Sequence, residues 1–177
     1  MAPRLLHYRV MKFLVSMLAF ASLAACMTAS GDDGGGGADS TPDSRCASGL
    51  RWTGGNSESP LMHPGGDCIG CHSSGEGPRF LVAGTVSASL DEPADCFGVE
   101  GAVVTITDAN GTSIDATSNA AGNFYISARQ NLAMPIHASV QLGGHVNAMG
   151  AAQSTGACAS CHTATGTGGA PGRILAP

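Results

Sequence analysis

Hydrophobic and polar residues alternate along the middle of the chain, between residues 80 and 142. In the run 102–107, Val104 and Ile106 share one face with Ala102, and threonines lie on the other face. This period of two is typical of a strand that buries one face. Other short apolar runs are separated by turn residues. The predicted strands are 80–88, 102–107, 113–118, 123–127 and 136–142.

Turn signals between these runs indicate how the strands connect. Asn110-Gly111 lies between two predicted strands and is a strong hairpin signal, because both residues tolerate a positive φ. Short strands with frequent turns favour an antiparallel β-sandwich. The predicted fold class is therefore mainly β, an immunoglobulin-like antiparallel sandwich over 80–142 that is flanked by loop-rich segments.

The segments on either side of the sandwich lack a clear period. Residues 46–79 and 143–177 are rich in glycine, proline and serine, so we expect ordered loops there. Residues 26–45 contain the run Gly31–Gly37, which holds only glycine and aspartate. Such a stretch buries little apolar surface, and it predicts a flexible linker.

Residues 1–25 have the pattern of an export signal. Basic residues are followed by the apolar run 13–21 and then by small residues before Cys26. The translated start is either Met1 or Met11. A membrane-spanning helix is an alternative, but the apolar run is shorter than the ~20 residues that a span needs.

The end of this segment, Leu23-Ala24-Ala25-Cys26, resembles a bacterial lipobox. The resemblance implies cleavage before Cys26 and lipid attachment to that residue, and several acyl chains give stable anchoring. An ordinary signal peptide followed by a chance cysteine stays open. We expect a lipoprotein of the cell envelope of a Gram-negative bacterium, in the periplasm or at the outer membrane, that contacts the membrane through this lipid.

The charge distribution excludes several classes of function. The formal net charge is −5, and beyond the export segment thirteen acidic residues face five arginines and no lysine. Nucleic-acid binding requires a basic footprint, which this chain lacks. We find no nucleophile motif or pair of catalytic carboxylates, so we predict neither an enzyme nor a small-molecule substrate.

Two pentapeptides, 68–72 and 158–162, share the pattern Cys-x-x-Cys-His. This is the attachment pattern of c-type haem, in which two thiols form thioethers and the histidine binds iron. Zinc binding and a disulfide within each pair are the alternatives. The prediction is two covalent haem c groups, with thioethers to Cys68, Cys71, Cys158 and Cys161 and with His72 and His162 as proximal ligands.

A second axial ligand for each iron would come from another methionine or histidine. Met62 and Met149 are the first candidates, and His63 and His145 are weaker ones. Methionine ligation raises the reduction potential of a haem. For each of the four, a packed methionine or a surface histidine is the alternative.

The cysteine count leaves one further pair. Of the seven cysteines, one is assigned to lipid and four to haem, which leaves Cys46 and Cys96. In an oxidising compartment an even remainder predicts a disulfide. Two separate thiols are the alternative.

Three stretches of the central region carry a family resemblance: Val82–Val86, Gly98–Ile106 and Thr117–Ile126. They resemble carboxypeptidase regulatory-like, transthyretin-like modules, and Phe124 takes the place of the core aromatic residue. The resemblance implies a seven-stranded sandwich with a structural or presentation role and no catalytic residues. The whole layout resembles small dihaem lipoproteins of environmental Gram-negative bacteria.

These observations together predict an exported, lipid-anchored dihaem c-type cytochrome that carries single electrons to or from a redox partner protein. One alternative is a non-redox cell-surface β-sandwich that binds a protein or glycan, with zinc or disulfides at the two motifs. Another is a haem-based gas sensor with an open iron position.

Overall fold

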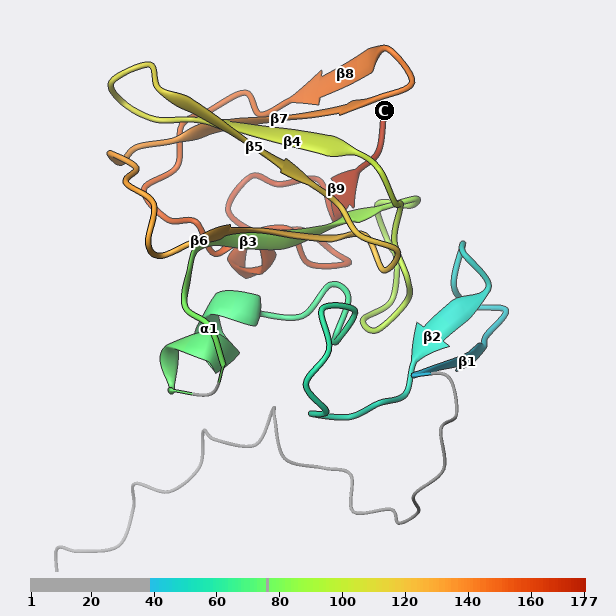
Figure 1. Ribbon diagram of the computed structural model, residues 1–177. Helices are drawn as coiled ribbons and strands as arrows, with labels where there is room; N and C mark the ends of the chain where they lie inside the picture. Colours follow the sequence, from blue (N-terminus) through green and yellow to red (C-terminus); the bar gives the residue numbers. More distant parts are fainter. Residues whose placement is uncertain (1–38, 76) are drawn as a thin grey trace, which may run out of the picture. The chain divides into compact units, whose positions relative to one another are not determined.

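Two β-sheets form the centre of the protein in the computed structural model, which describes residues 39–75 and 77–177 (Figure 1). The larger sheet has four antiparallel strands in the order β5-β4-β7-β8. β4 and β5 form the hairpin predicted at Asn110-Gly111, where Gly111 has a φ of 83°. The strands are β4 (Val103–Thr107), β5 (Ser113–Thr117), β7 (His137–Leu142) and β8 (His145–Ala148).

The smaller sheet has three strands in the order β6-β3-β9. Its central strand β3 (Phe80–Ser87) pairs with β6 (Asn123–Ser127) in the antiparallel sense. On its other edge β3 pairs in parallel with β9 (Ile174–Leu175), which comes from the end of the chain. The predicted fold class, mainly β with antiparallel pairing, is confirmed, and one parallel pair makes the smaller sheet mixed.

One hydrophobic core is shared by the two sheets, which form two layers in Figure 1. Val82 and Val86 of β3 contribute to it from one layer, and Val104 and Ile106 of β4 contribute from the other. In β6, Phe124 is 2% exposed while its neighbour Tyr125 is 52% exposed. The alternation in the sequence therefore separates a core face from an outer face, as expected for half-buried strands.

The five predicted strands are all present, and each bound agrees to within one residue. The flanking segments hold more regular structure than their sequences indicate. Helix α1 (Cys68–Ser73) lies where an ordered loop was predicted, and β8 and β9 lie in the loop-rich segment after residue 142.

A small two-stranded sheet precedes these elements. β1 (Ser40–Pro42) pairs with β2 (Leu50–Trp52), although residues 26–45 were predicted to be a flexible linker. The strand forms because β2 is held in place by Trp52, which is only 3% exposed. Three-residue strands are too short to show a period in the sequence.

A second hydrophobic cluster lies around Trp52. It contains Phe97 and Ala121, with Leu61 and Met62 packed against it. Cys46 and Cys96, the pair left over by the cysteine count, are joined by a disulfide. The disulfide connects the β1–β2 region to the loop between β3 and β4.

Among residues 39–75 and 77–177, no helix is both long and apolar enough to cross a membrane. The expected export signal at 1–25 and the expected lipidation site at Cys26 lie outside the described residues.

Candidate cofactor site

Helix α1 carries the first Cys-x-x-Cys-His motif. It begins after Asp67, whose carboxylate accepts a hydrogen bond from the Gly70 N–H at 3.0 Å and caps the helix. Residues three and four positions apart are neighbours on a helix surface. Cys68, Cys71 and His72 therefore lie on the same side of α1.

His72 lies against a row of aromatic rings. The centroid of its ring is 4.7 Å from that of Phe80, which is in turn 4.7 Å from that of Tyr125. Within the part of the chain that the structure describes, the buried Nδ1 of His72 has no hydrogen-bond partner. Leaving a buried ring nitrogen unpaired is costly.

The second motif begins in η1 (Cys158–Ser160), a single 3₁₀ turn that has no side-chain cap. The turn is closed by the N–H of His162, which donates to the Cys158 carbonyl at 2.9 Å. Cys158 packs against the core, and a Cβ on Gly84 would lie 2.9 Å from the Cys158 Cβ. The glycine in β3 thus makes room for the first cysteine of the motif.

Burial raises the pKa of the Cys158 thiol to about 12, and a smaller contribution comes from the neighbouring Cys68 thiol. Burial also raises the pKa of the Cys68 thiol. Both sulfurs are therefore protonated and weakly nucleophilic at neutral pH.

His162 is held in one orientation by the chain that follows it. Its Nδ1 donates a hydrogen bond to the Gly172 carbonyl at 2.9 Å. A histidine that binds metal usually donates its other ring N–H to a carbonyl or carboxylate, which fixes the tautomer. Nε2 of His162 is therefore the nitrogen with the free lone pair.

A cavity of about 600 Å³ opens between the two sheets beside the second motif. Its inner wall is formed by core side chains such as Val104, Ile106 and Phe124. Cys158, Cys161 and His162 all line it, and so does Met149. The volume falls within the ~300–1,000 Å³ range of ligand pockets. The cavity can therefore hold a large apolar group within reach of two thiols, one imidazole and one thioether.

The two motifs approach β3 from opposite faces. Successive residues of a strand point to opposite sides: Gly84 faces Cys158 in the core, whereas the Thr85 hydroxyl accepts a hydrogen bond from the Gly65 N–H at 2.7 Å. Gly65 belongs to the segment that leads into α1. Both α1 and η1 contact β3 directly, so a single strand lies between the two motifs.

The four predicted second axial ligands lie in different surroundings. Only Met149 is among the residues that line the described cavity. Met62 packs against the Trp52 cluster. His63 has both ring nitrogens engaged, with Nδ1 at 3.0 Å from Asp95 Oδ1 and Nε2 at 3.2 Å from Asn56 Oδ1. His145 is exposed in β8. The structure thus brings one of the four candidates to a motif cavity.

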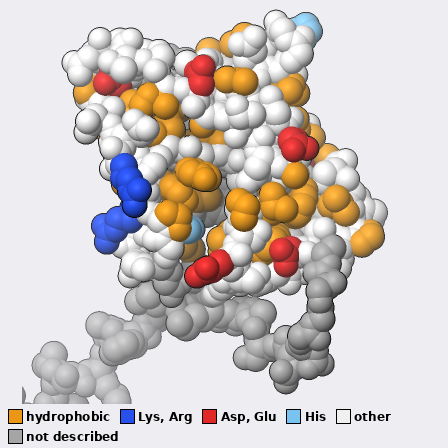
Figure 2. Space-filling model, viewed as in Figure 1, with side chains coloured by type: hydrophobic (Ala, Val, Ile, Leu, Met, Phe, Trp, Pro, Cys, Tyr) orange, Lys and Arg blue, Asp and Glu red, His pale blue; other side chains and the backbone are white. Residues whose placement is uncertain are grey.

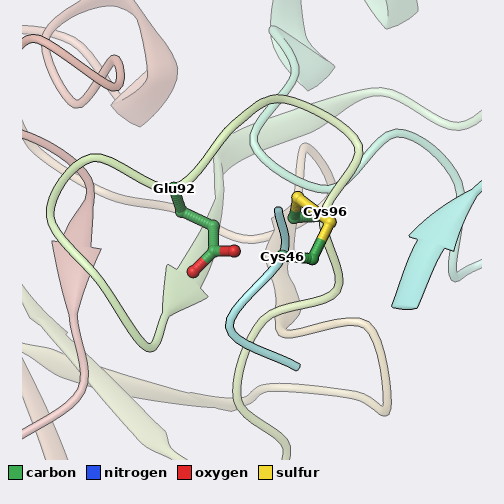
Figure 3. Close-up of side chains that lie close together, drawn as sticks. All are labelled: Cys46, Glu92 and Cys96. Carbon is green, nitrogen blue, oxygen red and sulfur yellow. A yellow bond between two sulfur atoms is a disulfide. The ribbon is translucent and has the colours of Figure 1, made fainter. Parts of the chain in front are cut away.

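Cys46, Cys96 and Glu92 form a separate buried group (Figure 3). Their sulfur and carboxylate ligand atoms all lie within 4.8 Å of one another. The two sulfurs are bonded to each other and offer no thiolate to a metal. Glu92 Oε1 accepts a hydrogen bond from the Ala47 N–H at 2.8 Å, and its Oε2 has no partner among the described residues.

In the described part of the chain, this is the one set of three such side chains whose ligand atoms converge. Among the described residues, neither Cys-x-x-Cys-His motif has three such ligand atoms within 4.8 Å of one another. Cys68, Cys71, Cys158 and Cys161 carry their sulfurs as thiols, with no disulfide within either motif.

Of the five arginines in the described part of the chain, Arg45 and Arg51 lie close to acidic side chains. On the face drawn in Figure 2, hydrophobic side chains form patches and the basic ones lie at one edge. Arg45 pairs with Asp43 at 2.7 Å, and Arg51 lies 3.7 Å from both Asp43 and Asp95. This distribution agrees with the acidic composition and offers no continuous basic footprint on the face shown.

Two residues of this region were not singled out from the sequence: Gly84 and Gly172. Nothing in the alternation identifies Gly84 as the place where Cys158 packs. Arg173 carried a signal, because it is the one Asp, Glu, Lys or Arg in the sequence after Arg129. A lone charge in an apolar and glycine-rich segment is often paired or buried for a specific reason.

No family model, no curated protein and no solved structure matches this chain.

Proposed function

We propose that the protein is a dihaem c-type cytochrome, a single-electron carrier of the bacterial cell envelope. The observation that carries the proposal is the cavity of about 600 Å³ whose lining includes Cys158, Cys161, His162 and Met149. The motif supplies the covalent and proximal groups that the attachment pattern requires. Mostly apolar walls suit a porphyrin ring, which is itself largely apolar.

Each side chain at the second site has a defined role in the proposal. Cys158 and Cys161 hold the haem through thioethers, and His162 binds iron through Nε2 while Gly172 orients its ring. Met149, which directly follows β8 and lines the same cavity, would supply a thioether sulfur to the iron. When bound, haem supplies one-electron redox chemistry, and the protein sets its ligands, burial and surroundings.

At the first site, Cys68 and Cys71 hold the second haem and His72 binds its iron. Phe80 and Tyr125 give the ring of His72 an apolar support. The sequence of residues 1–26 supports export and lipid anchoring at Cys26, which would keep the carrier at the membrane.

The proposal is tested by the visible spectrum of protein produced with a c-type maturation system, with the haem quantified as pyridine haemochrome. We expect two covalent haems per chain. Cys71→Ala and Cys161→Ala each remove one of them, and the double variant removes both.

The same measurement separates the rival function. If the protein is colourless and contains zinc, the proposed electron carrier is contradicted, and a non-redox binding module is the function that the result supports. A colourless protein without metal would leave the sandwich surface as its functional part.

A further inference from the structure

Arg173 occupies an unusual position for an arginine near the end of a chain. It is 6% exposed, and it lines the cavity beside the second motif. Burial lowers the pKa of its guanidinium, and the charges of Glu92 and Asp95 oppose this effect. Arginine stays protonated in proteins, so a buried positive charge is fixed at this point.

The guanidinium donates hydrogen bonds to backbone carbonyls of three separate segments. Nε donates to the Glu92 carbonyl at 2.9 Å, and Nη1 donates to the Gly65 carbonyl at 2.6 Å. Nη1 also lies 3.4 Å from the His162 carbonyl. The planar fork of arginine suits this arrangement, because it directs several donors in fixed directions.

Two of these three carbonyls lie in or near the Cys-x-x-Cys-His motifs. Gly65 lies three residues before Cys68, and His162 is the proximal histidine of the second motif. Residue 172 also holds His162, since its carbonyl accepts from Nδ1. The dipeptide Gly172-Arg173 is therefore hydrogen-bonded to both the ring and the backbone of His162. It is also hydrogen-bonded to the first segment at Gly65.

The close approach at Gly65 makes the link sensitive to small changes. Gly65 has a φ of 76°, and a Cβ there would lie 2.9 Å from the Arg173 Cζ. Any side chain at this position would push the guanidinium away from the first segment. The guanidinium could not move without disturbing its contact with His162.

We propose that Arg173 is a positioning residue that couples the two motif segments, so that a change at Gly65 alters the setting of His162. This inference rests on the proposed function, because the two groups that Arg173 couples are the two proposed haem sites. It adds a physical reason for the two sites to respond to each other. The link consists of hydrogen bonds through one side chain.

The test compares Gly65→Ala with Gly49→Ala in the purified protein. Gly49 has a similar φ of 73°, but a Cβ there meets nothing within 4 Å. We expect Gly65→Ala to shift the NMR signal of the His162 Nδ1 proton and Gly49→Ala to leave it unchanged. This readout does not depend on whether haem is attached.

In the haem-loaded protein, the NMR comparison uses the reduced form. The midpoint potential of the second site then gives an additional readout. We expect Gly65→Ala to change its reduction equilibrium by about fivefold, near the lower end of measured couplings between sites. Gly65→Ala made in an Arg173→Gln background should produce no further change, because the link is already broken.

Arg173→Lys separates positioning from charge. Lysine keeps the charge but lacks the planar fork, so we expect it to resemble Arg173→Gln. Equal His162 signals in Gly65→Ala and Gly49→Ala would overturn the proposal, and so would a wild-type signal in Arg173→Lys. If the wild type and all variants lack haem, the proposed function is contradicted, and the NMR comparison stays valid.

Discussion

Gly84 controls how closely the second motif approaches β3. It lies in the central strand of the smaller sheet, where the Cys158 Cβ would be 2.9 Å and the Phe124 ring 3.0 Å from an added Cβ. Interiors are close-packed, so one extra methyl group forces its neighbours to move. The absence of a side chain is therefore a requirement of the site.

We predict that Gly84→Ala destabilises the protein by about 1–3 kcal/mol, the usual cost of overpacking a core. It should also reduce haem attachment at the second motif while the first motif stays loaded. Urea unfolding and haem content measure the two effects. Gly150→Ala is the matched control for the unfolding measurement alone, because a Cβ there meets nothing within 4 Å although Gly150 lines the cavity. Equal behaviour of the two variants would contradict this role for Gly84.

Asp108 organises the β4–β5 hairpin through its carboxylate. Oδ1 accepts hydrogen bonds from the N–H groups of Asn110 and Thr112, both at 2.8 Å, and Oδ2 accepts one from Ala133 at 3.1 Å. The bond from Ala133 lowers the pKa of Asp108 most, and the bond from Thr112 adds to the effect. This side chain stabilises the folded state when it is ionised.

A lowered pKa in the folded state gives a defined pH dependence. The stabilisation is complete above the unfolded pKa of about 3.9 and is lost as pH falls through the lower, folded pKa. We predict that Asp108→Asn is less stable than wild type at pH 7 and that the difference shrinks toward pH 2. Urea midpoints over this range measure it, with the exposed Asp115→Asn as control. A difference that stays constant with pH would contradict the prediction.

At the scale of elements, one sequence pattern forms two different structures. The first motif is a capped α-helix because Asp67 precedes it, whereas Ala157 precedes the second motif and offers no side-chain cap. The second motif depends instead on contacts with β3 and with the segment that follows it. Its geometry is set by distant parts of the chain.

The segment between β8 and η1 brings Met149 to the cavity. We predict that Met149→Ala abolishes the methionine–iron charge-transfer band of the oxidised protein. It should also lower the midpoint potential of one haem, because methionine ligation raises it. Visible spectroscopy and a redox titration measure these changes.

Met62→Ala is the matched variant for this prediction. Met62 packs against the Trp52 cluster, so its removal should reduce stability and leave the charge-transfer band in place. The reverse result, in which Met62→Ala removes the band and Met149→Ala keeps it, would exclude Met149 as the ligand.

The sequence predicted elements wherever a period was long enough to recognise. β4 and β6 show a clear alternation, and their buried residues Val104, Ile106 and Phe124 follow from it. β9 has two residues, and its pairing with β3 depends on where the tail is placed. The cavity could not be predicted either, because Met149 and His162 line it together only as a result of the tertiary fold.

At the scale of the whole molecule, the Cys46–Cys96 disulfide joins two regions that also share backbone hydrogen bonds, such as those from the Trp52 N–H to the Asp95 carbonyl at 2.7 Å and from the Phe97 N–H to the Leu50 carbonyl at 3.0 Å. The two cysteines are 50 residues apart in the sequence. Between them lies the entire first motif. The disulfide therefore limits how far the β1–β2 region and the loop after β3 can separate when the chain unfolds.

We predict that the double variant Cys46→Ala/Cys96→Ala lowers the free energy of unfolding by about 4 kcal/mol, the chain-entropy value for a loop of this length. Chemical denaturation of the two proteins measures the difference. Wild-type protein treated with a thiol reductant should lose a similar amount. A loss below about 1 kcal/mol in both experiments would show that the two segments are held mainly by packing.

The burial of Cys158 against Gly84 bears on the order of events during biosynthesis. In the finished fold this thiol lies at the core, and β9 closes the sheet next to it. If the second motif carries haem as proposed, the porphyrin has to reach this sulfur before the last residues dock. The tail would then be the final part to assemble, after the second modification. A chain that skipped the modification would close over an unfilled interior and would be more readily cleaved by proteases.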